Sequence, residues 1–205
     1  QLSLDMQPYD DAMTEDSNHL QLVPSGPGYT TEPNLRMFNS VVHHAKDKLV
    51  LCSPYFIPDE SLLEAVTTAC YRDVEVDLLV SAKADQFMVD HAQSSYYQAL
   101  LEAGVRIFQF PEPFVLHSKF ILADPNLPGR EPLCMFGSSN MDMRSFGLNY
   151  ESTMLVAKGD LIDDFARLAI NYKKVCHELT LEEWNKRGLL RRYVDNVMRL
   201  TSALQ

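Results

Sequence analysis

The 205-residue sequence lacks any apolar run near the roughly 18 residues that a membrane-spanning helix requires, and it has no secretory signal peptide. It begins with Gln1 rather than Met. We therefore expect a soluble piece of a longer protein, whose membrane anchor could lie outside this sequence.

Cysteine is scarce and scattered. The sequence contains Cys52, Cys70, Cys134 and Cys176, and no two of them have the Cys-x-x-Cys spacing. This spacing argues against a zinc site or a disulfide framework. Because Cys52 and Cys134 lie in apolar, strand-like runs, the pattern predicts buried free thiols in a reducing compartment.

Positive charge is in short supply. Lys and Arg number 18 against 28 Asp and Glu, for a formal net charge of -10. A dedicated nucleic-acid-binding protein usually carries a basic face, so this balance disfavours a nucleic-acid partner. The hydrophobic content of 46% indicates a folded globular domain.

Strand-like and helix-like patterns alternate after residues 1–17, which are polar and acidic and are predicted to be a mobile lead-in. Predicted strands cover 19–23, 48–53, 74–81, 105–110, 115–123, 133–138 and 150–157. Predicted helices cover 32–46, 59–71, 85–103, 161–179, 182–188 and 189–204. Early alternation followed by adjacent strands predicts one α/β domain over 18–205, with a mixed, mainly parallel β-sheet flanked by helices on both faces.

The most informative feature is His117-Ser118-Lys119, with Asp124 following after four more residues. On a strand, His117 and Lys119 point to the same face. An imidazole beside a fixed positive charge suits phosphodiester chemistry, which needs an attack on phosphorus and neutralisation of its oxygens. Asp124 lies at an odd offset from His117, so we expect a structural role for it, binding Arg144 or a turn amide.

A second segment runs from Gly137 to Glu151. Ser138 and Asn140 are again two residues apart, and their hydroxyl and amide groups could hold phosphoryl oxygens; a plain turn is the alternative. Asp142 and Arg144 are interpreted as a helix start and ion-pair scaffold. This set of residues requires no metal and no organic cofactor.

These two segments resemble the signature of the phospholipase D superfamily, His-x-Lys-x4-Asp followed by Gly-Ser/Thr-x-Asn. The whole run from Gly137 to Glu151, together with Val23-Pro24-Ser25-Gly26-Pro27 and Ser53-Pro54-Tyr55-Phe56-Ile57-Pro58, is similar to the second, C-terminal half of bacterial cardiolipin synthases. The resemblance covers nearly all of residues 18–205. It implies catalytic roles for His117, Lys119 and Glu151, with Glu151 orienting the histidine, and phosphate binding by Lys119, Ser138 and Asn140.

The resemblance also implies an activity. Such an enzyme transfers a phosphatidyl group between two phosphatidylglycerol molecules through a phosphohistidine and yields cardiolipin and glycerol. The expected partners are phosphatidylglycerol, an anionic membrane surface, and either a missing N-terminal half carrying the other motif or a second copy of the chain. The expected location is the cytoplasmic side of a bacterial cell membrane.

Two other functions remain open from the sequence. One is a phospholipase D-like phosphodiesterase or nuclease that acts as a homodimer of single-motif chains. The other is a non-catalytic half that binds lipid phosphate. The basic residues of the helix predicted over 189–204, with Trp184 ahead of it, fit either an anionic lipid surface or packing on the domain itself.

Overall fold

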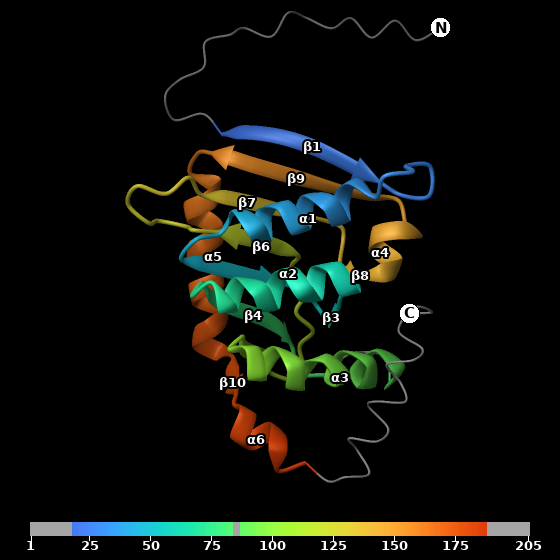
Figure 1. The fold of residues 1–205 in the computed structure, drawn as a ribbon, viewed down its shortest axis with the longest axis vertical. Coiled ribbons are helices and arrows are strands. Elements are labelled where there is room, and N and C mark those ends of the chain that lie inside the picture. The colour runs from blue at the N-terminus through green and yellow to red at the C-terminus, as the bar shows by residue number, and fades with distance from the viewer. Residues whose placement is uncertain (1–17, 84–86, 188–205) are drawn as a thin grey trace, which may run out of the picture.

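The computed structural model describes residues 18–83 and 87–187. The predicted acidic lead-in and the predicted helix over 189–204 lie outside the described residues. Between them the chain forms one layered α/β unit around a twisted β-sheet (Figure 1).

The main sheet has eight strands in the order β1-β9-β7-β6-β2-β4-β5-β10. A separate two-stranded sheet joins β3 to β8 at one end of the domain, beside α4 (Figure 1). The strands are β1 (His19–Ser25), β2 (Lys48–Cys52), β3 (Phe56–Ile57), β4 (Glu75–Ser81), β5 (Arg106–Phe110), β6 (Phe120–Ala123), β7 (Leu133–Gly137), β8 (Met141–Asp142), β9 (Glu151–Lys158) and β10 (His177–Leu179).

The α/β class and the mixed sheet are confirmed, but the expectation of a mainly parallel sheet is wrong. Within the eight-stranded sheet, only β2–β4 and β4–β5 pair in parallel, and the remaining pairs are antiparallel. The parallel pairs are those joined by helical crossovers, which return the chain to the same end of the sheet. No long helix separates β6, β7 and β9 along the chain, and these strands reverse direction from one to the next.

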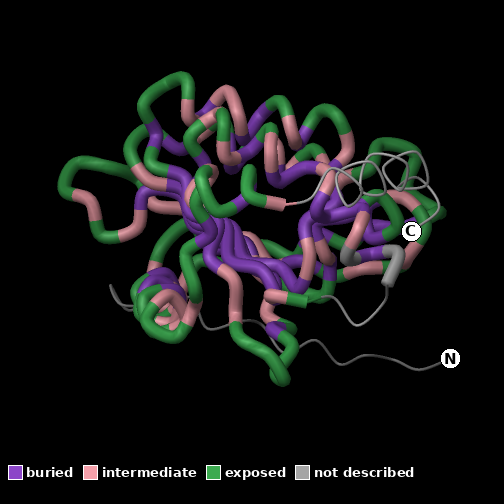
Figure 2. Tube along the Cα trace, turned by 90° about the horizontal axis from the view of Figure 1, so that it is seen from below, coloured by how far each residue is buried: buried purple, intermediate pink, exposed green. Residues whose placement is uncertain are grey.

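Helices cover both faces of this sheet, as predicted. One face is packed by α1 (Pro33–His44), α2 (Glu60–Tyr71) and α3 (Phe87–Ala103), and the other by α5 (Leu161–Val175), which among the described helices is alone there. The short helices are α4 (Met143–Gly147) and α6 (Leu181–Asn185). Figure 2 shows buried residues running along the sheet and on the helix sides that face it. In the described ranges, no helix combines the length and apolar character needed to cross a membrane.

Alternation along the strands sorts the core into two clusters. On β2, Leu49 and Leu51 pack toward α1 and α2, whereas Val50 and Cys52 pack toward α5. The predicted helix cap also forms, because the Asp59 carboxylate accepts hydrogen bonds from the backbone amides at the start of α2.

Three local expectations were wrong. The motif strand begins at Phe120 rather than at residue 115. The predicted loop 54–58 contains β3, which pairs with β8. Residues 177–179 form β10 instead of extending a helix, because they pair with β5 and Glu178 forms an ion pair with Arg106 there.

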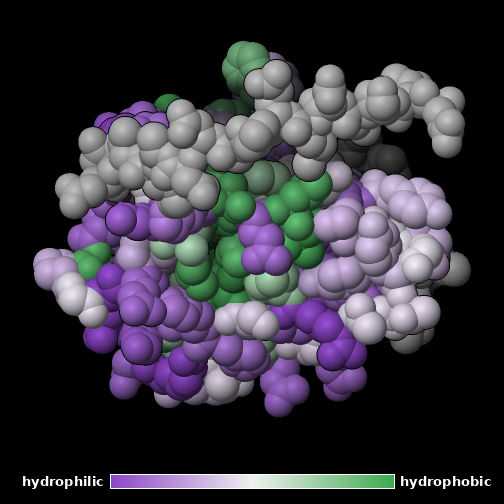
Figure 3. Space-filling model, turned by 90° about the horizontal axis from the view of Figure 1, so that it is seen from above, coloured by the Kyte–Doolittle hydropathy of each residue, from purple (hydrophilic) through white to green (hydrophobic). Residues whose placement is uncertain are grey.

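β1 is one edge of the sheet and pairs with β9. Leu20 and Leu22 on this strand are 48% and 56% exposed, although they lie on the α5 side of the sheet. Figure 3 looks down on this edge and shows apolar residues gathered within a hydrophilic surround. Of the described helices only α5 packs on this face, and it leaves the outermost strand partly uncovered.

Asp124 is a structural residue, as its offset predicted. It directly follows β6, is 1% exposed, and has a left-handed backbone conformation with φ of 49°. Its carboxylate accepts hydrogen bonds from the backbone amides of Lys46 at 2.9 Å, Asp47 at 2.9 Å and Lys48 at 2.8 Å. Of the two partners expected for Asp124, turn amides are therefore bound and Arg144 is not. We name this arrangement the Asp124 clamp.

The Asp124 clamp changes the ionisation of its own carboxyl group. Burial by itself raises the pKa, but the three backbone donors outweigh burial and hold the pKa of Asp124 below its ordinary 3.8. Because the folded-state pKa is depressed, the ionised group stabilises the fold above pH 3.8. That contribution is lost as the pH falls through the folded-state pKa.

We predict that Asp124→Asn lowers the free energy of unfolding at neutral pH by about 1–3 kcal/mol, because an amide nitrogen then faces a backbone donor. The wild-type advantage should shrink below pH 3.8. Urea unfolding of both proteins across the acidic range measures this. Glu64→Gln, an exposed acid-to-amide change on α2, is the control. Equal stability of wild type and Asp124→Asn at neutral pH would contradict the structural role.

Candidate active site

Four strand ends meet at one edge of the main sheet. They are the carboxyl ends of β2 and β7 and the amino ends of β6 and β9, which are neighbours in the sheet and alternate in direction. His117-Ser118-Lys119 leads into β6 at this edge, Ser138 follows β7, and Glu151 begins β9. The antiparallel pairing therefore collects residues from distant parts of the chain.

His117 and Lys119 lie on the same side of their segment, as predicted. The Lys119 Nζ is 3.2 Å from both His117 Nδ1 and His117 Nε2, and it donates to the His117 carbonyl oxygen at 2.8 Å. His117 is exposed, whereas Lys119 is only 9% exposed. An accessible imidazole thus lies beside a largely buried ammonium group.

The environment of Lys119 weakens the hold of its ammonium group on the proton. Burial is the largest influence and lowers the pKa of Lys119, while the negative charges of Glu151 and Asp142 act in the opposite direction. Among the described residues, no carboxylate forms an ion pair with this ammonium group. An anion such as a phosphate oxygen would supply that missing charge.

Ser118 points to the other side of the segment. Its Oγ is 2.8 Å from the hydroxyl oxygen of Tyr172 on α5, and its carbonyl oxygen accepts from the Cys52 thiol at 3.6 Å. These contacts fasten the segment to α5 and β2. They position His117 although they lie on the opposite side from its ring.

Ser138 and Glu151 are brought together directly. The Ser138 hydroxyl donates to a Glu151 carboxylate oxygen and accepts from the Ser152 amide at 3.0 Å. We expected Glu151 to hydrogen-bond His117, but the described residues contain no such bond. The local reason is backbone pairing, because Ser138 and Ser152 are also joined by a main-chain hydrogen bond at 3.1 Å. Glu151 is still close enough to act electrostatically on Lys119.

Asn140 has a partner that the sequence did not indicate. Its Nδ2 donates to the Tyr55 hydroxyl oxygen at 3.1 Å. Tyr55 belongs to the 53–58 segment, which the family resemblance included without assigning it a role. In a bare sequence, the signal for Tyr55 was only its place between two prolines just after a buried strand.

The predictions for Asp142 and Arg144 had different outcomes. Asp142 is buried and caps α4 by accepting from the Ser145 amide at 2.7 Å, so the predicted helix start is confirmed. Burial, as the main cause, raises the pKa of Asp142. Arg144 is exposed and makes no ion pair with any described residue, so the predicted ion-pair scaffold is not formed.

Gly137 permits the close approach of β7 and β9 at this edge. A Cβ atom there would overlap the Ser152 carbonyl oxygen and lie 2.8 Å from Thr153 Cα. Only glycine allows this backbone distance, and the distance sets the position of Ser138 against Glu151.

The cysteines and possible metal ligands add little to this site. The four thiols are free; Cys52 and Cys134 are buried as predicted, whereas Cys70 and Cys176 are partly exposed. Burial raises the pKa of the Cys134 thiol to about 12, so it is not a reactive thiolate. Within the described residues, no three His, Cys, Asp or Glu side chains are arranged to hold a metal ion.

We predict that Lys119→Met keeps or raises the thermal midpoint of unfolding. Burial already disfavours the charged lysine, so an apolar side chain of similar length removes an electrostatic cost. Scanning calorimetry at neutral pH measures this, with Lys158→Met, an exposed strand position, as the control. A large drop confined to Lys119→Met would show that the ammonium group is needed for folding.

Comparison with known sequences gives consistent matches. The family model described as "Cardiolipin synthase, PLD-like domain" matches residues 39–171. Cardiolipin synthase from Clostridium perfringens (strain SM101) is 34% identical over 184 residues, which are 90% of this chain and 37% of that protein. Cardiolipin synthase A from Serratia proteamaculans is 36% identical over 191 residues, 93% of this chain and 38% of that protein. The chain spans a little over a third of these relatives.

Solved structures share the fold. The phospholipase D family member Nuc from Salmonella typhimurium superposes with a TM-score of 0.65 at 15% identity, covering 80% of this chain and 99% of that one. Phosphatidylserine synthase from Haemophilus influenzae has a TM-score of 0.65 at 14% identity, covering 90% of this chain and 46% of that one. At these identities the likeness concerns the fold alone.

Proposed function

Because this chain belongs to the family of phospholipase D-like domains of cardiolipin synthases, we propose that it is the C-terminal catalytic half of a phosphatidyltransferase. The observation that carries the proposal is the His117–Lys119 pair at the sheet edge. An exposed imidazole and a buried ammonium group 3.2 Å apart are the two groups that phosphodiester transfer needs.

The proposed reaction joins two phosphatidylglycerol molecules. A histidine nitrogen attacks phosphorus, the bond from phosphorus to the glycerol oxygen breaks, and glycerol leaves with a proton from a second histidine. The hydroxyl of the second phosphatidylglycerol then gives its proton to that histidine and attacks phosphorus, and the phosphorus–nitrogen bond breaks. His117 fills one of these two roles, and a histidine outside this chain fills the other.

The neighbouring residues have supporting roles in this proposal. Lys119 neutralises a phosphoryl oxygen and thereby offsets its own burial. The Ser138 hydroxyl and the Asn140 side chain lie at the same edge and would contact the remaining oxygens. Glu151 acts through Ser138 and through its charge on Lys119 rather than by the expected hydrogen bond to His117.

The test is phosphatidyl transfer by the full-length protein on phosphatidylglycerol vesicles. We predict that His117→Ala abolishes cardiolipin formation, a loss of at least about a thousandfold for a missing nucleophile or proton carrier. His43→Ala, an exposed histidine on α1, is the matched control and should keep full activity. Cardiolipin formation at the wild-type rate by His117→Ala would exclude the proposed role.

A second candidate is a phosphodiesterase built from single units that pair with themselves. It is favoured by the fold match to Nuc, in which this chain covers 99% of a whole solved chain. The net charge of -10 makes DNA a poor substrate for such a unit. Cleavage of DNA by the isolated chain, with no transfer on phosphatidylglycerol by the full-length protein, would establish this candidate instead.

The proposed setting is an anionic membrane surface, on the cytoplasmic side of a bacterial membrane. Residues 158–205 hold nine Lys and Arg against seven Asp and Glu, whereas the rest of the chain is strongly acidic. We predict that co-sedimentation with vesicles requires anionic lipid and weakens as salt rises. Replacing Arg191 and Arg192 by Ser should reduce it, while Arg36→Ser on α1 should not. Equal binding to neutral vesicles would rule out the electrostatic attraction.

A further inference from the structure

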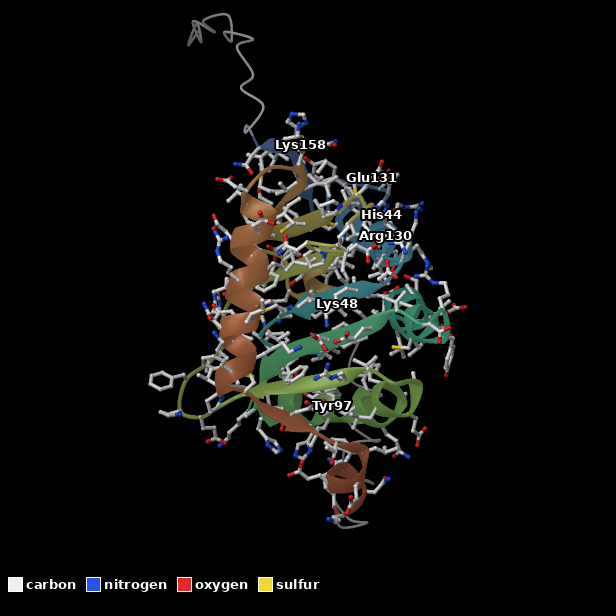
Figure 4. All side chains as sticks on the ribbon, turned by 90° about the vertical axis from the view of Figure 1, so that its left-hand side faces the viewer. His44, Lys48, Tyr97, Arg130, Glu131 and Lys158 are labelled. Carbon is white, nitrogen blue, oxygen red and sulfur yellow. The ribbon has the colours of Figure 1, made fainter. Side chains whose placement is uncertain are left out.

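A cavity of about 490 Å³ lies between α5 and the sheet, at the opposite ends of the strands from His117. Its walls include Lys48 and Glu75, which begin β2 and β4, and residues of the loop between β6 and β7. Figure 4 looks onto this side of the sheet, with Lys48 labelled beside the helix. The volume falls within the roughly 300–1,000 Å³ typical of small-molecule sites.

One part of the cavity is apolar. It is formed by Val50 and Leu122 from the sheet and by Ala166, Ala169 and Ile170 from α5. The two alanines are small, so the helix stands over the sheet without filling the space between them. This part would accommodate a hydrocarbon segment and exclude water from it.

The other part is polar and electrically balanced. Asp77 is completely buried, and its Oδ2 forms ion pairs with Lys48 Nζ at 2.9 Å and with Lys173 Nζ at 2.5 Å. Glu75 also pairs with Lys48 and with Arg106, and Arg106 pairs with Glu178. Asp47, which also lines the cavity, pairs with Arg130. Four cations therefore meet four carboxylates. A charged ligand entering here would lack a free counter-charge and would pay its desolvation cost uncompensated.

The cluster offers an accessible donor and an accessible acceptor. Lys48 and Glu75 line the cavity and keep 22% and 49% of their side-chain surface exposed, whereas Asp77 is completely buried behind them. A neutral hydroxyl group can donate to the Glu75 carboxylate and accept from the Lys48 ammonium group, and it adds no charge.

We propose that this cavity binds a neutral, hydroxyl-bearing amphiphile, with its hydroxyl group beside Lys48 and Glu75 and its hydrocarbon chain between α5 and the sheet. The site is separate from His117 and does not depend on the transferase function. The charge balance selects the neutral head group over both an anionic and a cationic one of equal chain length.

Isothermal titration of the chain with three probes below their micellar concentrations tests the selection. The probes are monodecanoylglycerol, decanoate and decyltrimethylammonium, which share a hydrocarbon chain and differ in head-group charge. We expect monodecanoylglycerol to bind saturably and about tenfold more tightly than either charged probe. Absence of saturable monodecanoylglycerol binding, or equal or tighter binding of a charged probe, would overturn the proposal.

Variants locate the binding. Ile170 lines the cavity and is 55% exposed, so Ile170→Glu should fold normally. It should weaken the binding of monodecanoylglycerol about tenfold, because it places a charge beside the hydrocarbon chain of the ligand. Val175→Glu is the matched control, because Val175 is equally exposed on α5 and does not line the cavity. Leu127→Glu, in the opposite wall, should repeat the Ile170→Glu result. Unchanged affinity in both cavity variants would place the ligand elsewhere and refute the proposal.

Discussion

The Asp124 clamp is the constraint on which the arrangement of the active site depends. Asp124 directly follows β6 and Lys119 directly precedes it, so a four-residue strand separates the clamp from the candidate active site. By holding the start of β2, the Asp124 carboxylate fixes the register of β2 against β6. A slip of one residue would turn Lys119 toward α5 and Ser118 toward the side on which His117 and Lys119 now lie. A residue at the far end of the strand thus determines which side chains face the candidate active site.

The site is also arranged at a cost to stability. Lys119 is nearly buried, and within the described part of the chain the more distant charges of Glu151 and Asp142 offset part of the loss of its hydration. His117 stays exposed, so the proposed reacting group is not the one that is desolvated. The protein therefore keeps an under-neutralised cation ready for an anionic ligand, in agreement with preorganised electrostatic stabilisation of phosphoryl oxygens.

Local patterns in the sequence predicted most elements of this fold. Short apolar and β-branched runs located seven of the strands of the main sheet, and the His117–Lys119 spacing placed both side chains on one side. The odd offset of Asp124 predicted its structural role. Strand direction was not predictable, since it depends on which distant strands become neighbours. β10 was not predicted, because three residues are too few to show a periodicity. They form a strand by pairing with β5.

The hydrogen-bond partners of side chains were the least predictable feature of the structure. The bond between Ser138 and Glu151 replaces the expected one to His117 because main-chain pairing holds Ser138 beside Ser152. The contact of Asn140 with Tyr55 joins residues 85 positions apart. Such contacts depend on ångström-scale backbone placement, and spacing along the chain does not encode it.

The pairing of β1 has a consequence for biosynthesis. β1 ends at Ser25, but its partner β9 extends from Glu151 to Lys158. During translation the ribosome must add more than a hundred residues before β1 finds a partner, and β1 meanwhile presents unpaired backbone groups together with Leu20 and Leu22. The parallel β2–β4–β5 unit, with its helical crossovers, can assemble earlier. Sheet completion is therefore a late step in synthesis, during which a chaperone that binds extended apolar segments would have its clearest target in β1.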